Sequence, residues 1–235
     1  MPLEDDIQQI RDFLLKRYKN NLAGILIFGS ANTQQFAEGK SDIDHMIFLK
    51  EQKGINFEEE INFLFNSLKQ HHFAAQYFNT LEGIKDYIQR RKSFSTYITI
   101  VTKDGSRVIY STPEFERTKK YLIEHPLTKE EIKDQIKEKD RFELDGYFKE
   151  ISEFNLTKAL MAHLRRKLQI INYFRTGKLI FDYEKCLNNA DSDKEEKGQL
   201  ESLYENYKKR KKLSQGEIDY YFNLAKKFTK KITLL

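Results

Sequence analysis

Two short polar motifs in the first third of the chain have the residue types needed to bind a phosphate and a metal ion. Gly29 and Ser30 directly follow the apolar run Gly24–Phe28, and Asp42 and Asp44 begin a second apolar run after a gap of eleven residues. Glycine allows the backbone to approach a ligand closely, serine offers a hydroxyl donor, and unpaired N–H groups at the start of a helix attract anions. Gly29-Ser30 is therefore a predicted phosphate site.

The two aspartates have the spacing of metal ligands. Residues two apart in a strand point to the same face, so Asp42 and Asp44 are expected to lie side by side. Paired carboxylates repel each other unless a cation lies between them, and Mg²⁺ prefers such oxygen ligands together with substrate phosphates. Each motif alone is common, as a turn or as exposed acids. Together they predict half of a phosphoryl-transfer site, with His45 packed on the opposite face.

The first half of the chain, which must position these motifs, contains both helical and strand patterns. Hydrophobic periodicity predicts three helices and five strands there. The helices are expected near 7–18, 57–69 and 81–89, and the strands at 24–28, 42–49, 73–78, 97–102 and 107–110. Asp104-Gly105 between the last two strands is typical of a hairpin turn.

The second half has helical patterns only. Helices are expected near 113–124, 128–151, 155–174, 181–189, 195–211 and 214–232. Pro113 suits a first helical position, and Thr128 with Glu131 forms a capping-box pattern. The sequence therefore predicts an α+β protein, with an α/β domain built on a mixed sheet over 1–112 and an all-α helical bundle over 113–235.

Composition limits the class of protein. The chain has 235 residues, with 18 Phe and 13 Tyr, which is too much apolar material for a disordered chain. Its single cysteine, Cys186, excludes an internal disulfide framework. No apolar run approaches the roughly 20 residues of a membrane span, and the acidic start is unlike a signal peptide. These features favour a cytoplasmic protein with no membrane partner.

The net charge of +5 is unevenly distributed. Residues 1–112 carry equal numbers of basic and acidic side chains, so the excess lies in 113–235. A basic excess is compatible with nucleic-acid binding or with solubility alone. Residues 130–153 are locally acidic, which would suit a cationic acceptor.

The pattern Gly29-Ser30 followed by Asp42-Ile43-Asp44 resembles the signature of the nucleotidyltransferase superfamily that includes DNA polymerase beta. The order of elements and the following helical domain are similar to the kanamycin- and lincosamide-type antibiotic nucleotidyltransferases. The resemblance implies Mg²⁺-dependent transfer of a nucleoside monophosphate from a nucleoside triphosphate, with ATP favoured, to an acceptor hydroxyl. Asp42 and Asp44 would be catalytic metal ligands, and Gly29 and Ser30 would bind phosphates of the nucleotide.

The chain also departs from that pattern. Many superfamily members carry a third carboxylate on the strand that corresponds to Phe73–Phe78, where Gln76 is the nearest polar residue here. By analogy with the kanamycin enzyme, Asp145 is the expected general base and Lys149 the ligand of the triphosphate, four residues apart on one helix face. Glu143 is the competing base. A homodimer is a further alternative, because a partner subunit could supply the missing carboxylate.

Three functions follow as hypotheses. The first is nucleotidyl transfer to a small molecule such as an antibiotic, with the acceptor held by the helical domain. The second is modification of a protein or an RNA, as in antitoxin-like members, with the basic C-terminus as the docking surface. The third is a degenerate module that binds a nucleotide without catalysis.

Overall fold

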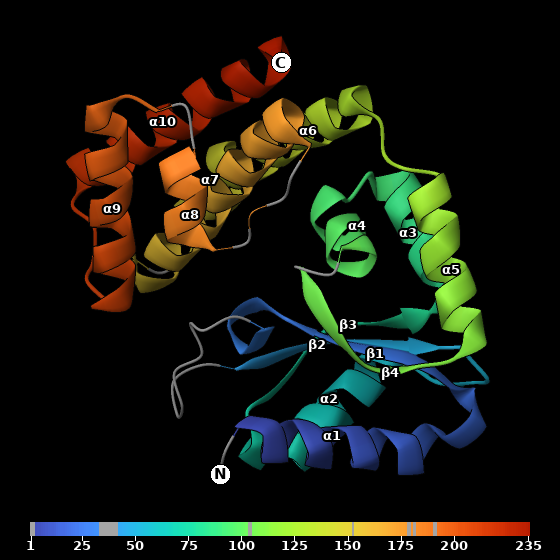
Figure 1. Ribbon diagram of the computed structural model, residues 1–235. Helices are drawn as coiled ribbons and strands as arrows, with labels where there is room; N and C mark the ends of the chain where they lie inside the picture. Colours follow the sequence, from blue (N-terminus) through green and yellow to red (C-terminus); the bar gives the residue numbers. More distant parts are fainter. Residues whose placement is uncertain are drawn as a thin grey trace. The chain divides into compact units, whose positions relative to one another are not determined.

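The protein forms two units along the chain, Met1–Leu127 and Thr128–Leu235. The structure is a computed structural model that describes residues 3–32, 42–102, 105–151, 153–177, 180, 182–189 and 192–235 (Figure 1). The first unit contains every strand found among these residues, and the second contains only helices. The expected α+β class, with a mixed sheet followed by helices, is confirmed.

A four-stranded sheet organises the first unit. Its strands are β1 (Leu22–Phe28), β2 (Ile43–Leu49), β3 (Phe73–Thr80) and β4 (Ser106–Ser111). They lie in the order β3-β2-β1-β4, with β1 antiparallel to both β2 and β4, and β2 parallel to β3. β1 and β2 are therefore central, which explains their nearly continuous burial.

Helices cover both faces of this sheet. They are α1 (Leu3–Tyr18), α2 (Phe57–Leu68), α3 (Leu81–Arg91), α4 (Phe94–Val101) and α5 (Pro113–Glu124). α1 and α2 lie on one face, and α3, α4 and α5 on the other (Figure 1). Ile10 and Leu14 of α1 pack with Ile25 and Ile47 of the sheet in one fully buried cluster.

The opposite face is held by aromatic packing. Phe48 of β2 contacts Phe115 of α5 with ring centroids 5.3 Å apart, and it also contacts Tyr77 of β3. Phe115 lies over Gly24 of β1, where an added Cβ would stand 2.6 Å from the ring. This contact belongs to the first unit, so α5 packs with the sheet. The boundary expected at 112–113 therefore moves to 127–128, because α5 covers β1.

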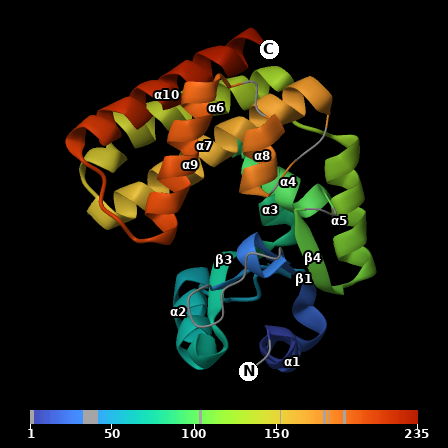
Figure 2. The same ribbon diagram turned by 60° about the vertical axis from the view of Figure 1, so that its left-hand side comes forward.

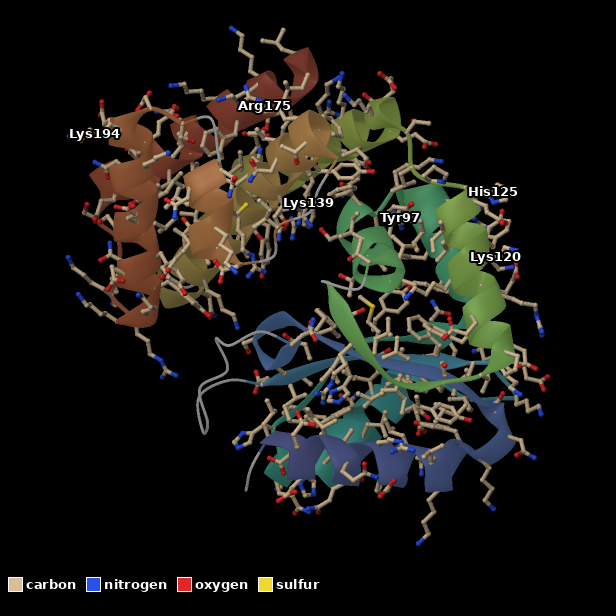
Figure 3. All side chains as sticks on the ribbon, in the orientation of Figure 1. Tyr97, Lys120, His125, Lys139, Arg175 and Lys194 are labelled. Atoms are coloured by element: carbon tan, nitrogen blue, oxygen red, sulfur yellow. The ribbon has the colours of Figure 1, made fainter. Side chains whose placement is uncertain are left out.

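One predicted strand is a helix. The run Tyr97–Thr102 was expected to pair in a hairpin, but α4 occupies Phe94–Val101 and only β4 follows it as a strand. Thr99 and Thr102 are accommodated there because their hydroxyls donate to backbone carbonyls one turn earlier. Tyr97, which is labelled in Figure 3, is buried. Tertiary burial thus overrides strand propensity. Asp104, in the predicted turn, lies outside the described residues.

The second unit is a set of packed helices (Figure 2). They are α6 (Lys129–Asp145), α7 (Glu153–Thr176), α8 (Tyr183–Asn189), α9 (Lys194–Lys208) and α10 (Gln215–Leu234). Capping boxes begin α6 at Thr128, as the sequence predicts, and α10 at Ser214. The long α7 packs against α8, α9 and α10, so it forms the centre of the unit.

A buried ion pair joins three of these helices. Lys167 of α7 is 1% exposed and bonds the carboxylate of Asp140 on α6. Its ammonium group also donates to the Ala225 carbonyl of α10 at 3.0 Å and to the Thr229 hydroxyl. Burial lowers the pKa of Lys167 to about 8. The amine is therefore still charged at neutral pH and needs its carboxylate partner.

No helix among the described residues is both long and apolar enough to cross a membrane.

Substitution of Gly24 by alanine is expected to destabilise the fold by about 2 kcal/mol, because the new methyl group would overlap the buried Phe115 ring. Thermal unfolding of the two proteins measures the change. Gly198→Ala is the matched control, since nothing lies within 4 Å of a Cβ on this α9 residue. It should stabilise by about 0.5 to 1 kcal/mol. An unchanged midpoint for Gly24→Ala would refute the packing argument.

Lys167→Met is expected to cost about 3 kcal/mol at pH 7, because Asp140 would remain as a largely buried charge without its ammonium partner. Adding Asp140→Asn should recover part of the loss, since the amide carries no charge. Chemical denaturation of the single and double variants measures both effects. Lys226→Met, which removes an exposed lysine 3.8 Å from Asp145, serves as the control and should change stability little. Equal losses in the single and double variants would contradict this account.

Candidate active site

The first site motif forms a tight turn at the end of β1. Gly29 has φ +69°, in the left-handed region that favours glycine, and a 3₁₀ turn runs over Gly29–Asn32. Gly29 and Ser30 are half-buried, and Ala31 is buried. Residues 33–41, between this turn and Asp42, lie outside the described residues.

The second motif lies directly beside this turn. Antiparallel pairing sets Asp44 of β2 opposite Phe28, the residue before Gly29. A Cβ added at Gly29 would stand 2.6 Å from Asp44 Oδ2, so a larger residue there would displace the carboxylate. The structure therefore brings the predicted phosphate turn and one predicted metal ligand into contact. Glycine is required at position 29 both for its backbone conformation and for this approach.

The neighbours of Asp44 differ in burial. Asp42 is exposed just before β2, and Asp44 is partly buried. His45 is fully buried on the other face, with Nδ1 2.6 Å from the Ile43 carbonyl and its ring against Phe73. Burial lowers the pKa of His45 to about 4, so it is neutral. The prediction that His45 is a packed residue is confirmed.

Gln76 is the contact that sequence reasoning did not assign. Its amide Nε2 donates to Asp44 Oδ1 at 2.9 Å from the neighbouring strand β3. The only signal in the sequence was that Gln76 takes the place where many superfamily members carry a carboxylate in the run Phe73–Phe78. That this strand pairs with β2 is seen in the structure alone. Asp44 is thus contacted from β1 on one side and from β3 on the other.

This donor set fits Mg²⁺. Among the residues that the structure describes, no cluster of three or more His, Cys, Asp or Glu side chains is arranged to enclose a metal. Asp42 and Asp44 supply hard oxygen atoms from one short segment, and the adjacent turn offers backbone and hydroxyl groups for a phosphate. Mg²⁺ is commonly held by one or two carboxylates together with substrate phosphates rather than by a closed protein cage.

The pair expected from the second unit has a different geometry. Asp145 ends α6, and Lys149 lies in a separate 3₁₀ turn, Tyr147–Lys149, after Gly146. The prediction that the two lie one turn apart on one helix is therefore wrong, because the chain leaves the helix at Gly146 with φ −128° and ψ −88°. Both side chains are exposed, and Asp145 lies 3.8 Å from Lys226.

Glu143, the competing base, is already engaged. It bonds the ring Nδ1 of His163 on α7, and its other oxygen lies 3.2 Å from Lys139. Burial by itself would raise the pKa of Glu143, but the hydrogen bond from His163 and the nearby cations lower it overall. A carboxylate stabilised in this way is a weaker proton acceptor.

Comparison with known proteins agrees with the fold. The family model described as "Nucleotidyltransferase domain" matches residues 7–160, which include the whole sheet and all the site residues of the first unit. No curated protein sequence matches the chain at a significant level.

One solved structure similar to this chain is spectinomycin adenyltransferase AAD(9) from Enterococcus faecialis, crystallised with ATP and spectinomycin. The match has a TM-score of 0.61 and 15% sequence identity, and it covers 97% of this chain and 99% of the other. At this identity the likeness shows a shared fold over the full length. The family model covers well over half of the sequence, and the chain therefore belongs to the nucleotidyltransferase family.

Proposed function

We propose that this protein transfers a nucleoside monophosphate, with ATP as the favoured donor, to a hydroxyl group of a small molecule such as an antibiotic, with Mg²⁺ as the cofactor. The observation that carries this proposal is the contact between the Gly29 turn and Asp44. It joins a candidate phosphate site to a candidate metal ligand at one end of two central strands.

The proposed roles follow from the chemistry of each group. The Gly29 backbone and the Ser30 hydroxyl bind terminal phosphate oxygens of the nucleotide, and the carboxylates of Asp42 and Asp44 hold the metal. Mg²⁺ at this position supplies neutralisation of phosphate charge. Phosphoryl transfer needs mainly positioning and electrostatic stabilisation, so a rigid pair of central strands is a suitable scaffold.

A small-molecule acceptor is supported by the similarity to a structure determined with ATP and spectinomycin. The acidic segment 130–153 provides a second argument, since it would attract a cationic acceptor. Transfer to a protein or an RNA is the alternative, and the basic residues of the C-terminal half would then serve for docking.

The test is incubation with ATP labelled at the α-phosphate and Mg²⁺, against an antibiotic panel, RNA and a cell lysate. Label on a small hydroxyl compound is the expected result, and a chelator should abolish it. Label on protein or RNA would select the alternative acceptor. No transfer to any acceptor would contradict the proposal and favour a module that only binds nucleotide.

Asp42→Asn and Asp44→Asn are each expected to lower the turnover rate at least about 1,000-fold, or about 4 kcal/mol in the barrier, because each removes a charged metal ligand. Steady-state kinetics at saturating ATP measure the loss. Asp12→Asn, an exposed carboxylate of α1 that accepts from Gln8, is the matched control and should keep full activity. Substantial turnover in either site variant would refute the assigned role.

Asp145 remains the proposed general base, because Glu143 is held by His163 and Lys139 whereas Asp145 is solvent-exposed. Lys149 remains the proposed ligand of the triphosphate. Asp145→Asn should reduce kcat by about 100-fold or more while leaving the KM for ATP nearly unchanged. Lys226→Met, which removes the neighbouring cation but keeps the carboxylate, is the control and should retain turnover. Near-normal turnover of Asp145→Asn would exclude Asp145 as the base.

A further inference from the structure

We infer that Gln76 is a positioning residue that orients the Asp44 carboxylate as a metal ligand. This inference rests on the proposed function, because it assigns a role to a residue that acts through Asp44. Gln76 takes no part in the chemical step itself.

The hydrogen bond has a defined direction. Gln76 Nε2 lies 2.9 Å from Asp44 Oδ1. An amide carbonyl at that distance from a carboxylate oxygen would be repelled, so the NH₂ group must face Asp44. An ionised carboxylate only accepts hydrogen bonds, and a hydrogen bond to a charged acceptor is stronger than one between neutral groups.

The strand is shaped to deliver this side chain. In the parallel pairing of β2 with β3, His45 lies opposite Ala75 and Met46 lies opposite Tyr77. Gln76 is therefore the extra residue of a β-bulge. Bulges redirect a side chain and interrupt regular pairing, and they are frequent beside active sites. Without the bulge, Gln76 would lie opposite Met46, farther along β2 from Asp44.

The two oxygens of Asp44 consequently have different surroundings. Oδ1 accepts from Gln76 on the β3 side, and Oδ2 lies against the Gly29 turn on the β1 side. Partial rotation of the carboxylate about its χ2 bond would break the hydrogen bond, so the amide holds the plane of the carboxylate with one oxygen toward β3 and the other toward the turn. Groups that orient metal ligands in this way typically contribute 10- to 100-fold in metal affinity.

The identity of the residue also matters. A third carboxylate at position 76 would add negative charge to a site that already holds Asp42 and Asp44. The neutral amide supplies a donor instead, so it orders Asp44 before any cation is present. Gln76 is exposed and belongs to none of the buried clusters, so its replacement should leave the core intact.

The experiment compares Gln76→Met, which removes the amide at similar length, with the full-length wild-type protein. Mn²⁺ is titrated in the presence of a saturating non-hydrolysable ATP analogue, and free Mn²⁺ is followed by electron paramagnetic resonance. We expect Gln76→Met to weaken Mn²⁺ binding about 10-fold with an unchanged melting temperature. In the transfer reaction, the Mg²⁺ concentration for half-maximal rate should rise by a similar factor, while kcat at saturating Mg²⁺ is largely recovered.

Gln89→Met is the matched control. Gln89 is an exposed glutamine of the same unit, and its amide donates to the Tyr121 hydroxyl at 2.8 Å on the surface of α3 and α5. It should bind Mn²⁺ as the wild type does. If Gln76→Met lowers the melting temperature, Gln76→Ala provides a second variant, which removes the amide and keeps only Cβ.

A double-variant comparison separates this inference from the proposed function. Asp44→Asn alone should weaken Mn²⁺ binding, and Gln76→Met should add nothing in that background, because the amide acts through Asp44. Normal Mn²⁺ binding by Gln76→Met, or an undiminished effect in the Asp44→Asn background, overturns the role of Gln76 alone. Normal binding by Asp44→Asn overturns the proposed metal role of Asp44 and this inference with it.

Discussion

The site of the first unit depends on the pairing register of β1 and β2. Because Phe28 lies opposite Asp44, the chain must turn at Gly29 exactly beside that carboxylate. A slip of one residue would move every side chain of β2 to the other face of the sheet and would bury Asp44 where His45 packs. The hydrophobic residues of β2 prevent such a slip, since Ile43 and Ile47 are fully buried against α1 and α2.

The same register places Asp44 of the candidate site and the buried His45 on opposite faces of β2. His45 is neutral and packs on Phe73 within the core, whereas Asp44 reaches the partly open edge at the end of β1. Because of the bulge at Gln76, β3 stays paired with β2 while the Gln76 amide donates to Asp44. Asp44 is thus the one partly buried residue of a strand that is otherwise buried, and the neighbouring strands restrict how its carboxylate can rotate.

The second unit uses charge differently. Lys167 and Asp140 join α6, α7 and α10 inside the unit. Removing these two charges from water costs free energy, so each charge needs a close partner of opposite sign. Glu143 belongs to the same polar region through His163, which restricts it as a proton acceptor. Asp145, two residues later, lies in solvent at the end of α6. The acidic segment therefore contains carboxylates with structural roles beside others that are accessible to a substrate.

The sequence by itself determined the α+β class, the strands β1 to β4, the helices of the second half and the motif Gly29-Ser30 with Asp42 and Asp44. These features follow from local periodicity, capping residues and spacing. Only the tertiary structure decided that 94–101 is a helix, that α5 packs with the sheet, and that the chain leaves the α6 helix at Gly146. It also decided that Gln76 contacts Asp44. The two residues are 32 positions apart in the chain, and their contact depends on the strand order and on a bulge in β3, neither of which a local sequence pattern encodes.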